Sequence, residues 1–565
     1  MRWSAKHEQP SSKAVQGGVY TEGKNDDDLQ RTSIPTSSCE ERLATAQPLV
    51  QGPWEPNVDS SIVDAAATGV DLASTGNSFD QLLEFWPDLN SSSRNIGDAL
   101  NVVGSSVAGR PPSIPPSLVD LPSTLVELWF KHVCPAWSTF DSDVNYNRMI
   151  AAATWSSSEP VFYTMQSMAA TYLAECMPGL RNHLRTAVAK ADHSIRQAVN
   201  HFRSSGERHV DTGLIFAILG MGTSLHWTNG EVLHSWLDLA TEALNLWTSR
   251  RTVLETYFHA YFKQAIIYWR MLVCIASDIE HEGVEHRRTQ RQSISQAPAQ
   301  GTTTNGLARL AGRIGPDQDF QGTRPNSWCG VSSDAIDLFG QVLALCRSAR
   351  VESRYLNLPA ESGFSAIARE LQMELQSLDL NSPLLEDDLL GFSTDTVDDL
   401  TPTSHLLLTA EAYRQAALLQ LHLTFSPDQE DSESRQTPSL ESRSVNSANL
   451  ALRLAKTLEQ IPVDSGSRSI HPVLYLSAAA GLKYDTSITT DSETIDTSTL
   501  EIAMARRLVL TRLSLLQHVL PSRPILCILD LVKAIWKEYD EAQEGSIEVH
   551  WIDVMMNTGL QTLFG

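Results

Sequence analysis

The chain is 565 residues long, enough for one large domain or for two or three of average size. Hydrophobic residues make up 42% of it, a proportion that supports a sizeable buried core. The formal net charge is −24 at pH 7, and a surface of this sign repels phosphate. This charge argues against a protein whose main surface wraps nucleic acid, so any contact with DNA is expected to come from a partner or from a part missing from this sequence.

Seven cysteines are spread along the chain without a CxxC pair, at positions 39, 134, 176, 274, 329, 346 and 527. Such a dispersed set is typical of reduced thiols in a cytosolic or nuclear protein. The N-terminal sequence lacks the apolar stretch of a secretory signal, and no apolar run approaches the roughly 20 residues that span a bilayer. We therefore expect neither secretion nor a membrane partner.

Residues 1–115 are rich in Ser, Asp, Gly and Pro and show little periodicity, which predicts a disordered acidic arm. Within this arm, residues 78–89 read SFDQLLEFWPDL. Bulky side chains alternate there with acidic ones, and the bulky set is Phe79, Leu82, Leu83, Phe85 and Trp86. This mixture is typical of activation segments that fold into a groove on a coactivator. Alternatively, the segment is a short helix that docks on the protein's own body.

Residues 116–565 carry apolar side chains at helical spacing and form the predicted helical domain. A capping box of Thr124 and Glu127 predicts a first helix that Pro135 stops or kinks. Two further helices are expected on either side of Pro178, packed as an antiparallel hairpin. Their apolar stripes comprise Val161, Met165, Met168, Ala169, Tyr172 and Cys176 in one helix, and Leu180, Leu184, Ala187, Val188, Ala191, Ile195, Val199 and Phe202 in the other.

Helical patterns resume after several polar stretches. New helices are predicted from Ser332 and from Leu406, and the last three are predicted near 500–519, 524–540 and 548–562. The polar stretches at about 285–322, 426–445 and 485–498 are predicted to be disordered inserts. Alternating strand patterns are almost absent, so we expect an all-α fold, a large irregular helical bundle.

Several patterns resemble ligand or catalytic motifs, and a structural explanation is preferred for each. His281 and His286 are five residues apart, whereas the histidines of a zinc-protease helix are four apart. Gly220 and Gly222 lack the third glycine of a phosphate loop and are expected at a helix terminus. Cys329 is either a reactive thiol or, as we prefer, a buried core residue. The basic cluster 286–291 is either a nuclear import patch or a solvated loop, the latter being preferred.

Four motifs resemble a known family. The run HVCPAWSTFDS at 132–142, with the helical sequence that follows it, resembles the opening of the second type of fungal-specific transcription factor regulatory domain. Later elements of that family are similar to RPNSWCGVS at 324–332, AYRQAALLQLHLTF at 412–425 and HWIDVMMNTGLQTLFG at 550–565. The resemblance covers the chain from about Leu121 to its C-terminus. It implies a regulator of transcription that works in the nucleus.

One element of the family pattern is missing from this sequence. Members usually begin with a binuclear zinc cluster built from six cysteines, but here only Cys39 precedes Cys134. Residues 2–8, RWSAKHE, resemble the segment that often follows the cluster. Either an upstream exon is missing from the gene model, or the protein reaches DNA through other proteins.

Two functions agree with these observations. The favoured one is a fungal transcription regulator, an activator of a pathway-specific or secondary-metabolite gene set, with coactivators or a DNA-binding protein as partners. The alternative is a helical adaptor or scaffold without a direct role in transcription. We expect no enzymatic activity and no catalytic, cofactor-binding or metal site. No sustained heptad pattern specifies an oligomeric state.

Overall fold

The computed structural model describes residues 120–174, 180–206, 208–229, 234–276, 284, 287, 325–331, 333–356, 361–381, 394–425, 440–484, 497–541 and 549–563. Throughout these ranges the regular secondary structure is helical, so the predicted all-α fold is confirmed. The predicted arm 1–115 and most of the predicted inserts lie outside the described residues.

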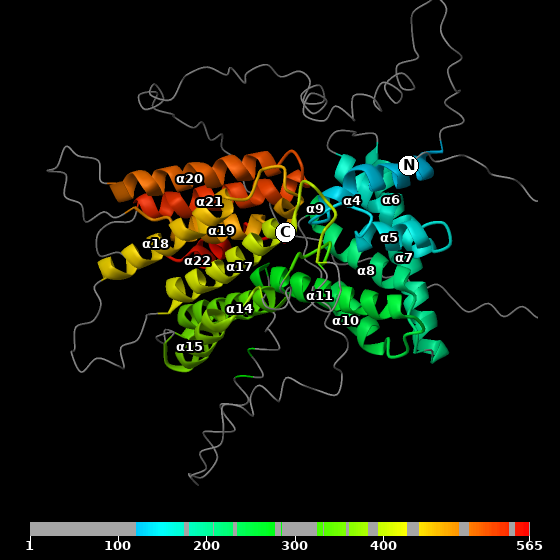
Figure 1. Ribbon diagram of the computed structural model, residues 1–565, viewed down its shortest axis with the longest axis horizontal. Helices are drawn as coiled ribbons and strands as arrows, with labels where there is room; N and C mark the ends of the chain where they lie inside the picture. The colour runs from blue at the N-terminus through cyan, green and yellow to red at the C-terminus, as the bar shows by residue number, and fades with distance from the viewer. Residues whose placement is uncertain are drawn as a thin grey trace, which may run out of the picture. The chain divides into compact units, whose positions relative to one another are not determined.

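The N-terminal half of the described body runs from α3 to α11 (Figure 1). Its helices are α3 (Leu121–Leu128), the π-helical turn η2 (Trp129–Val133), α4 (Cys134–Ala136), α5 (Tyr146–Thr154), α6 (Glu159–Leu173), α7 (Arg181–Ser205), α8 (Thr212–Ser224), α9 (His226–Asn229), α10 (His234–Leu246) and α11 (Val253–Ala276). Helices α6 and α7 pack along one another, as the predicted hairpin requires.

The C-terminal half comprises α14 to α22 and contacts the first half mainly where α14 packs on α11 (Figure 1). Its helices are α14 (Ser333–Leu356), α15 (Glu361–Ser377), α17 (Thr403–Thr424), α18 (Leu440–Glu459), the 3-10 helix η4 (Gly466–Ile470), α19 (Pro472–Gly481), α20 (Thr497–Leu516), α21 (Ser522–Glu541) and α22 (Trp551–Thr558). Among the described helices, none combines the length and apolarity needed to cross a membrane.

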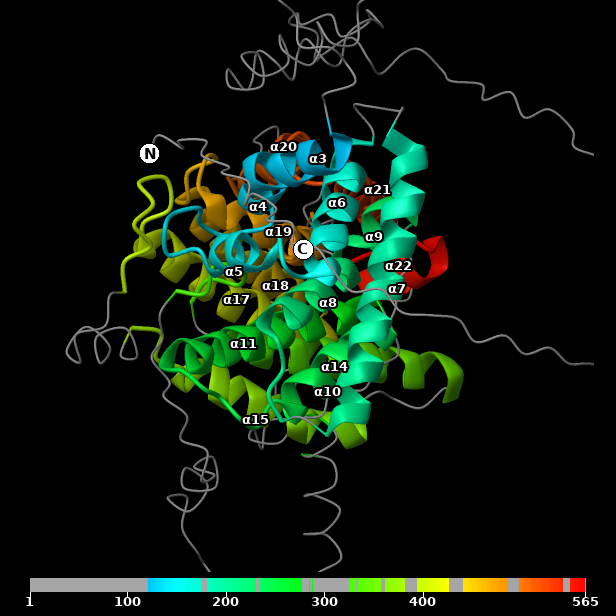
Figure 2. The same cartoon turned by 90° about the vertical axis from the view of Figure 1, so that its right-hand side faces the viewer.

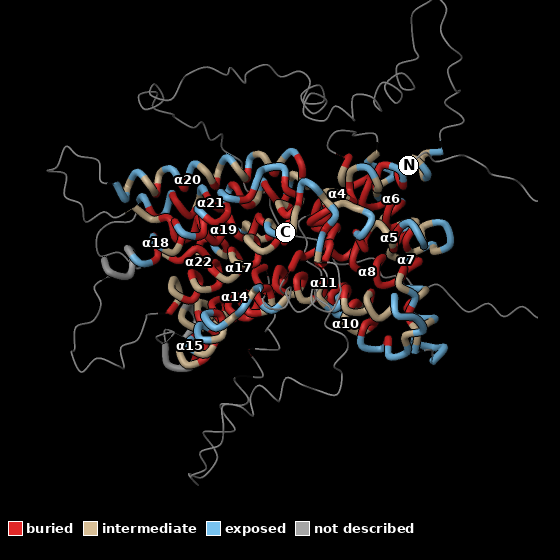
Figure 3. The backbone as a smooth tube through the Cα atoms, in the orientation of Figure 1, coloured by how far each residue is buried: buried red, intermediate tan, exposed pale blue. Residues whose placement is uncertain are grey.

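One continuous hydrophobic core runs through both halves, from α3 to α22 (Figure 3). The predicted stripe of α6 is buried in it, with Val161, Met165, Met168 and Ala169 fully covered. On α7 the buried stripe is Ala187, Ala191, Ile195 and Val199, at the predicted spacing. Because burial of apolar surface drives folding, these stripes determine which face of each helix points inward.

The first helix begins earlier than its predicted capping box. Asp120 is its N-cap and accepts hydrogen bonds from the backbone N–H of Ser123 and from the Ser123 hydroxyl. Thr124 lies inside the helix and donates its hydroxyl to the Asp120 carbonyl. Pro122 explains the difference, because proline favours the first turn of a helix, where its missing N–H costs nothing.

Two expectations for the inserts were wrong at their edges. Helix α18 begins at Leu440, inside the stretch predicted to be an insert up to 445. Arg287 is not in a solvated loop, because its guanidinium pairs with both oxygens of Glu374 at 2.9 and 2.8 Å. Its Nε also donates to Gln341 at 3.1 Å. These partners come from α14 and α15, more than fifty residues away, so a local pattern could not reveal them.

Gly220 and Gly222 lie in the last two turns of α8, near the helix terminus where they were expected, and both are buried in the core. A Cβ on Gly222 would lie 2.2 Å from the Trp269 ring, and one on Gly220 would lie 2.8 Å from the Thr164 methyl group. The two glycines therefore allow α8 to approach α11 and α6 closely. Packing, rather than helix termination, accounts for both residues.

Candidate functional site

The candidate coactivator-binding residues Phe79, Leu82, Leu83, Phe85 and Trp86 lie outside the described residues. The four sequence motifs, in contrast, lie almost entirely within the described part. They bring together a buried polar junction and a small cavity between the two halves, and these are the features from which a site can be built.

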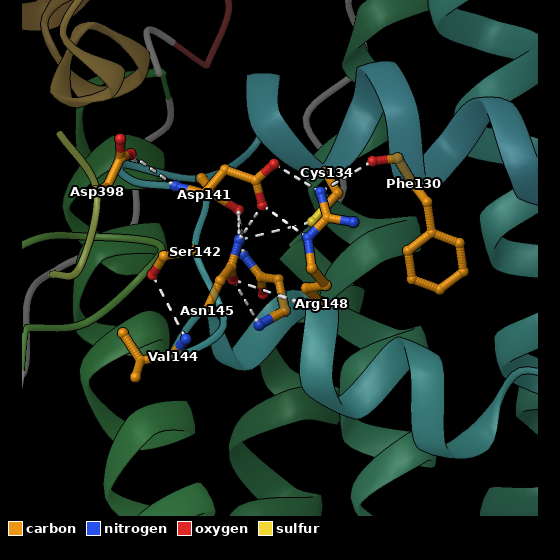
Figure 4. A network of polar contacts seen from close by, with 10 residues as sticks. Phe130, Cys134, Asp141, Ser142, Val144, Asn145, Arg148 and Asp398 are labelled. Carbon is orange, nitrogen blue, oxygen red and sulfur yellow. Dashed lines mark hydrogen bonds and ion pairs between the residues drawn. The ribbon is translucent and has the colours of Figure 1, made fainter. Parts of the chain in front are cut away.

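The junction starts at the π-helical turn of the first motif. In this turn the N–H of Cys134 donates to the carbonyl of Trp129, five residues back. Pro135 has no N–H, so the next carbonyl in the series, that of Phe130, has no such donor. Arg148 fills this role, with its Nη2 3.0 Å from the Phe130 oxygen (Figure 4).

Arg148 is itself held by the loop that follows the motif. Its Nε and Nη2 donate to the two carboxylate oxygens of Asp141 at 2.8 and 2.5 Å (Figure 4). The same carboxylate accepts the Asn145 amide at 3.2 Å, and Asn145 also caps α5 through its side-chain oxygen. The backbone N–H of Asp141 donates to Asp398 at 3.0 Å, which ties the loop to the segment before α17.

The first and second motifs meet directly, although 187 residues separate the partners of one of their bonds. The N–H of Thr139 donates to the Ser327 carbonyl at 2.7 Å, and the Thr139 hydroxyl donates to the Asn326 carbonyl at 3.1 Å. The rings of Trp137 and Trp328 lie beside each other, with centroids 5.3 Å apart. The second motif is therefore a tight turn pressed against the first.

The third and fourth motifs also contact one another. Trp551, at the start of α22, donates its indole N–H to the Gln420 side chain on α17 at 2.7 Å. Tyr413, two turns before Gln420 on α17, donates its hydroxyl to the Ile470 carbonyl at 2.7 Å. The motifs are thus the contact points between helices that are distant in sequence.

A small cavity lies next to this junction, between the two halves. Its volume is about 40 Å3, room for roughly one to three water molecules. Aromatic, proline and aliphatic side chains form most of its wall, including Trp137, Tyr268, Trp328 and Pro524. Sequence reasoning missed this cavity, because its lining comes from eight separate stretches of chain.

Two polar groups in the cavity wall lack a full set of partners. The Ser469 hydroxyl has no hydrogen-bond partner among the described residues. His226 is 1% exposed, and its ring contacts the Thr223 backbone, which leaves a ring nitrogen without a described partner. Burial lowers the pKa of His226 to about 3, so the ring is neutral at physiological pH. The cavity can therefore hydrogen-bond water or a small neutral group.

The buried thiols are chemically quiet. Burial raises the pKa of Cys134 to about 12 and raises that of Cys329 as well. Both therefore remain protonated near neutral pH, whereas a nucleophile or a metal ligand requires the thiolate. Cys329 is 3% exposed, which agrees with the preferred interpretation as a core residue. In the described ranges, no group of three or more His, Cys, Asp or Glu side chains is placed to hold a metal ion.

Comparison with known proteins identifies the family. A family model described as fungal specific transcription factor domain matches residues 124–565, and all four motifs fall within or overlap this range. No curated protein and no solved structure matches the chain. The family match covers well over half of the sequence and the helical body that the four motifs hold together. The chain belongs to the fungal-specific transcription factor domain family.

Proposed function

We propose that this fungal transcription regulator is an activator that works in the nucleus through residues 78–89. The helical body is the regulatory domain, and the segment recruits a coactivator. The observation that carries the proposal is the acidic and aromatic segment placed outside a domain whose family is regulatory. The buried, protonated thiols and the neutral His226 support a role without catalysis.

The protein's approach to DNA is expected to depend on a partner. Its net charge is −24, and only Cys39 precedes the helical domain, so this sequence offers no set of thiolates for a zinc cluster. A DNA-binding partner protein supplies the sequence-specific contact in this proposal. No cofactor is proposed.

The test is a reporter assay with the chain fused to a heterologous DNA-binding domain. Leu82, Leu83, Phe85 and Trp86 are replaced together by alanine, while Asp80, Glu84 and Asp88 stay. Each buried side chain of this size contributes about 1.5–3 kcal/mol, so four losses remove about 6–12 kcal/mol, which is comparable to the roughly 8 kcal/mol of a micromolar contact. We expect reporter activation to fall to background.

The control for this variant is the stability of the same protein. The segment lies outside the helical domain, so the quadruple variant should keep the cooperative unfolding of the wild type, and its denaturation midpoint should fall by no more than docking of the segment contributes. Full activation by the variant would refute the proposed role of the segment. Wild-type fusions that are inert but still retain protein partners would favour the adaptor function instead.

A further inference from the structure

The outer face of α7 is positively charged, although the whole protein has a net charge of −24. Arg181, Arg185 and Lys190 are exposed on the N-terminal half of this helix, with His183 and His193 between and beside them. Helix α7 lies on the outside of the body, next to α6 (Figure 2). Within the described chain, no ion pair is formed by Arg181, Arg185 or Lys190, although Lys190 Nζ lies 5.2 Å from the centre of the Tyr163 ring.

The C-terminal half of the same helix is different. Arg196 pairs with Asp192 at 2.8 Å, and Arg203 pairs with Glu242 of α10 at 2.5 Å. The charges near the start of α7 are also placed against the helix dipole, which favours acidic residues there. Among the described residues, Arg181, Arg185 and Lys190 in the N-terminal half of α7 therefore have no ion-pair partner.

Arg185 and Lys190 line an open groove between α6 and α7, while Arg181 lies outside its lining. The volume of the groove is about 640 Å3. Tyr163 and Ala189 contribute apolar surface, while Arg185, Lys190 and His193 line it with positive or titratable groups. Glu159 is the acidic residue of the lining. A groove of this kind suits a segment that carries both bulky apolar and acidic side chains.

The chain itself contains such a segment. From residue 51 to residue 93 there are seven acidic residues and no Lys or Arg, the acidic set being Glu55, Asp59, Asp64, Asp71, Asp80, Glu84 and Asp88. The described body begins at Asp120, the N-cap of α3, and α3 packs on α6, one wall of the groove. The thirty residues between Leu89 and Asp120 can span up to roughly 100 Å, so the segment can reach the groove.

We propose that residues 78–89 dock in the groove between α6 and α7, with their carboxylates facing Arg181, Arg185 and Lys190. The inference rests on the proposed function and adds its regulation. In the docked state the bulky side chains of the segment lie against the body and are withheld from a coactivator. Release from α7 allows the segment to bind the coactivator. The strength of docking on α7 therefore determines the fraction of protein molecules that can activate transcription.

The first experiment measures hydrogen–deuterium exchange in the full chain. The test variant combines Arg181→Glu, Arg185→Glu and Lys190→Glu, all on the exposed face of α7. We expect residues 78–89 to be protected in the wild type and to lose protection in this variant. Three reversed charges should weaken docking by about tenfold or more, because each attraction becomes a repulsion.

Two further variants make the result specific. A matched control reverses three exposed charges elsewhere, Arg507→Glu, Lys533→Glu and Lys537→Glu on α20 and α21, and should leave the protection unchanged. A charge-swapped chain adds Asp80→Lys, Glu84→Lys and Asp88→Lys to the reversed α7 and should regain protection. Equal exchange of residues 78–89 in the wild type and the α7 variant would overturn the proposal.

The reporter assay separates this inference from the proposed function. Reversal of the α7 charges should raise reporter activation several-fold, whereas the alanine variant of the segment should stay at background with or without the reversal. If residues 78–89 are protected in the exchange experiment but the reporter fusion is inert, docking is correct and the activator function is wrong. If α7 instead binds duplex DNA, and this binding rather than segment protection is lost on charge reversal, docking is refuted.

Discussion

Arg148 shows what a single side chain contributes at the junction. Pro135 removes one backbone donor from the π-helical turn, and the guanidinium of Arg148 replaces it at the Phe130 carbonyl. The same guanidinium neutralises Asp141, whose loop reaches Ser327 and Asp398. One residue thus links a helix end, a loop and two distant segments.

We predict that Arg148→Met destabilises the protein by about 1–2 kcal/mol. The substitution leaves the Asp141 carboxylate and the Phe130 carbonyl without a charged partner, and the estimate allows for the partial exposure of both charges. The denaturant midpoint is the measurement. Lys131→Met is the control, because Lys131 and Glu127 form an exposed pair one turn apart and should contribute less than about 0.5 kcal/mol. Equal effects of the two substitutions would contradict the role given to Arg148.

At the scale of elements, α8 is the most constrained helix of the N-terminal half. Every residue from Gly213 to Ser224 is buried, and the helix contacts α5, α6, α7, α10 and α11. A helix surrounded in this way has no polar face, so amphipathic periodicity does not mark its orientation. Its two glycines provide the close approaches that larger side chains would prevent.

Gly222→Ala is expected to destabilise the protein even though alanine is the better helix former. Alanine in a helix gains about 1 kcal/mol over glycine, but its Cβ would overlap Trp269 and Trp236. Overpacking of this kind costs about 1–3 kcal/mol and shifts the neighbouring helices, so we expect a net loss and a lower melting temperature.

Gly206→Ala provides the comparison for this prediction. Gly206 follows α7 with a φ of 66°, and nothing lies within 4 Å of a Cβ there. Its substitution should cost about 1 kcal/mol through backbone strain alone, without disturbing near-ultraviolet signals from tryptophan. A Gly222→Ala variant as stable as the wild type would show that α8 and α11 are less closely packed than the structure indicates.

At the scale of the whole molecule, His226 makes stability depend on pH. Burial lowers its folded pKa to about 3, while the unfolded chain titrates near 6.5. The unfolded state therefore binds more protons below about pH 6.5, and the stabilisation by neutral His226 is lost as the pH falls from there toward 3. At pH 5 the loss is about 2 kcal/mol for this one histidine.

His226→Gln should remove this part of the pH dependence, because glutamine keeps a polar side chain but does not titrate. The free energy of unfolding is measured at pH 7 and pH 5 for both proteins. Its decrease over this interval should be about 2 kcal/mol smaller in the variant. Identical decreases would mean that His226 takes up a proton in the folded state, and the cavity would then have to open to water.

The sequence predicted much of the fold because helical periodicity is a local property. The stripes of α6 and α7 could be read from Val161 to Val199 without knowledge of any other helix. The start of α3 was misplaced because Asp120 and Thr124 both suit an N-cap, and the signal that separates them is Pro122. The candidate segment 78–89 likewise came from composition alone and stays a prediction.

The sequence by itself determined the helical class, the family and the acidic aromatic segment, since each depends on residues that are neighbours or follow a fixed spacing. Only the tertiary structure decided that Arg287 lies in a partly buried ion pair, that Gly222 permits close packing and that His226 is neutral. It also placed Arg185 and Lys190 beside a groove. Burial and electrostatic environment are set by partners from the whole chain, and no local pattern contains them.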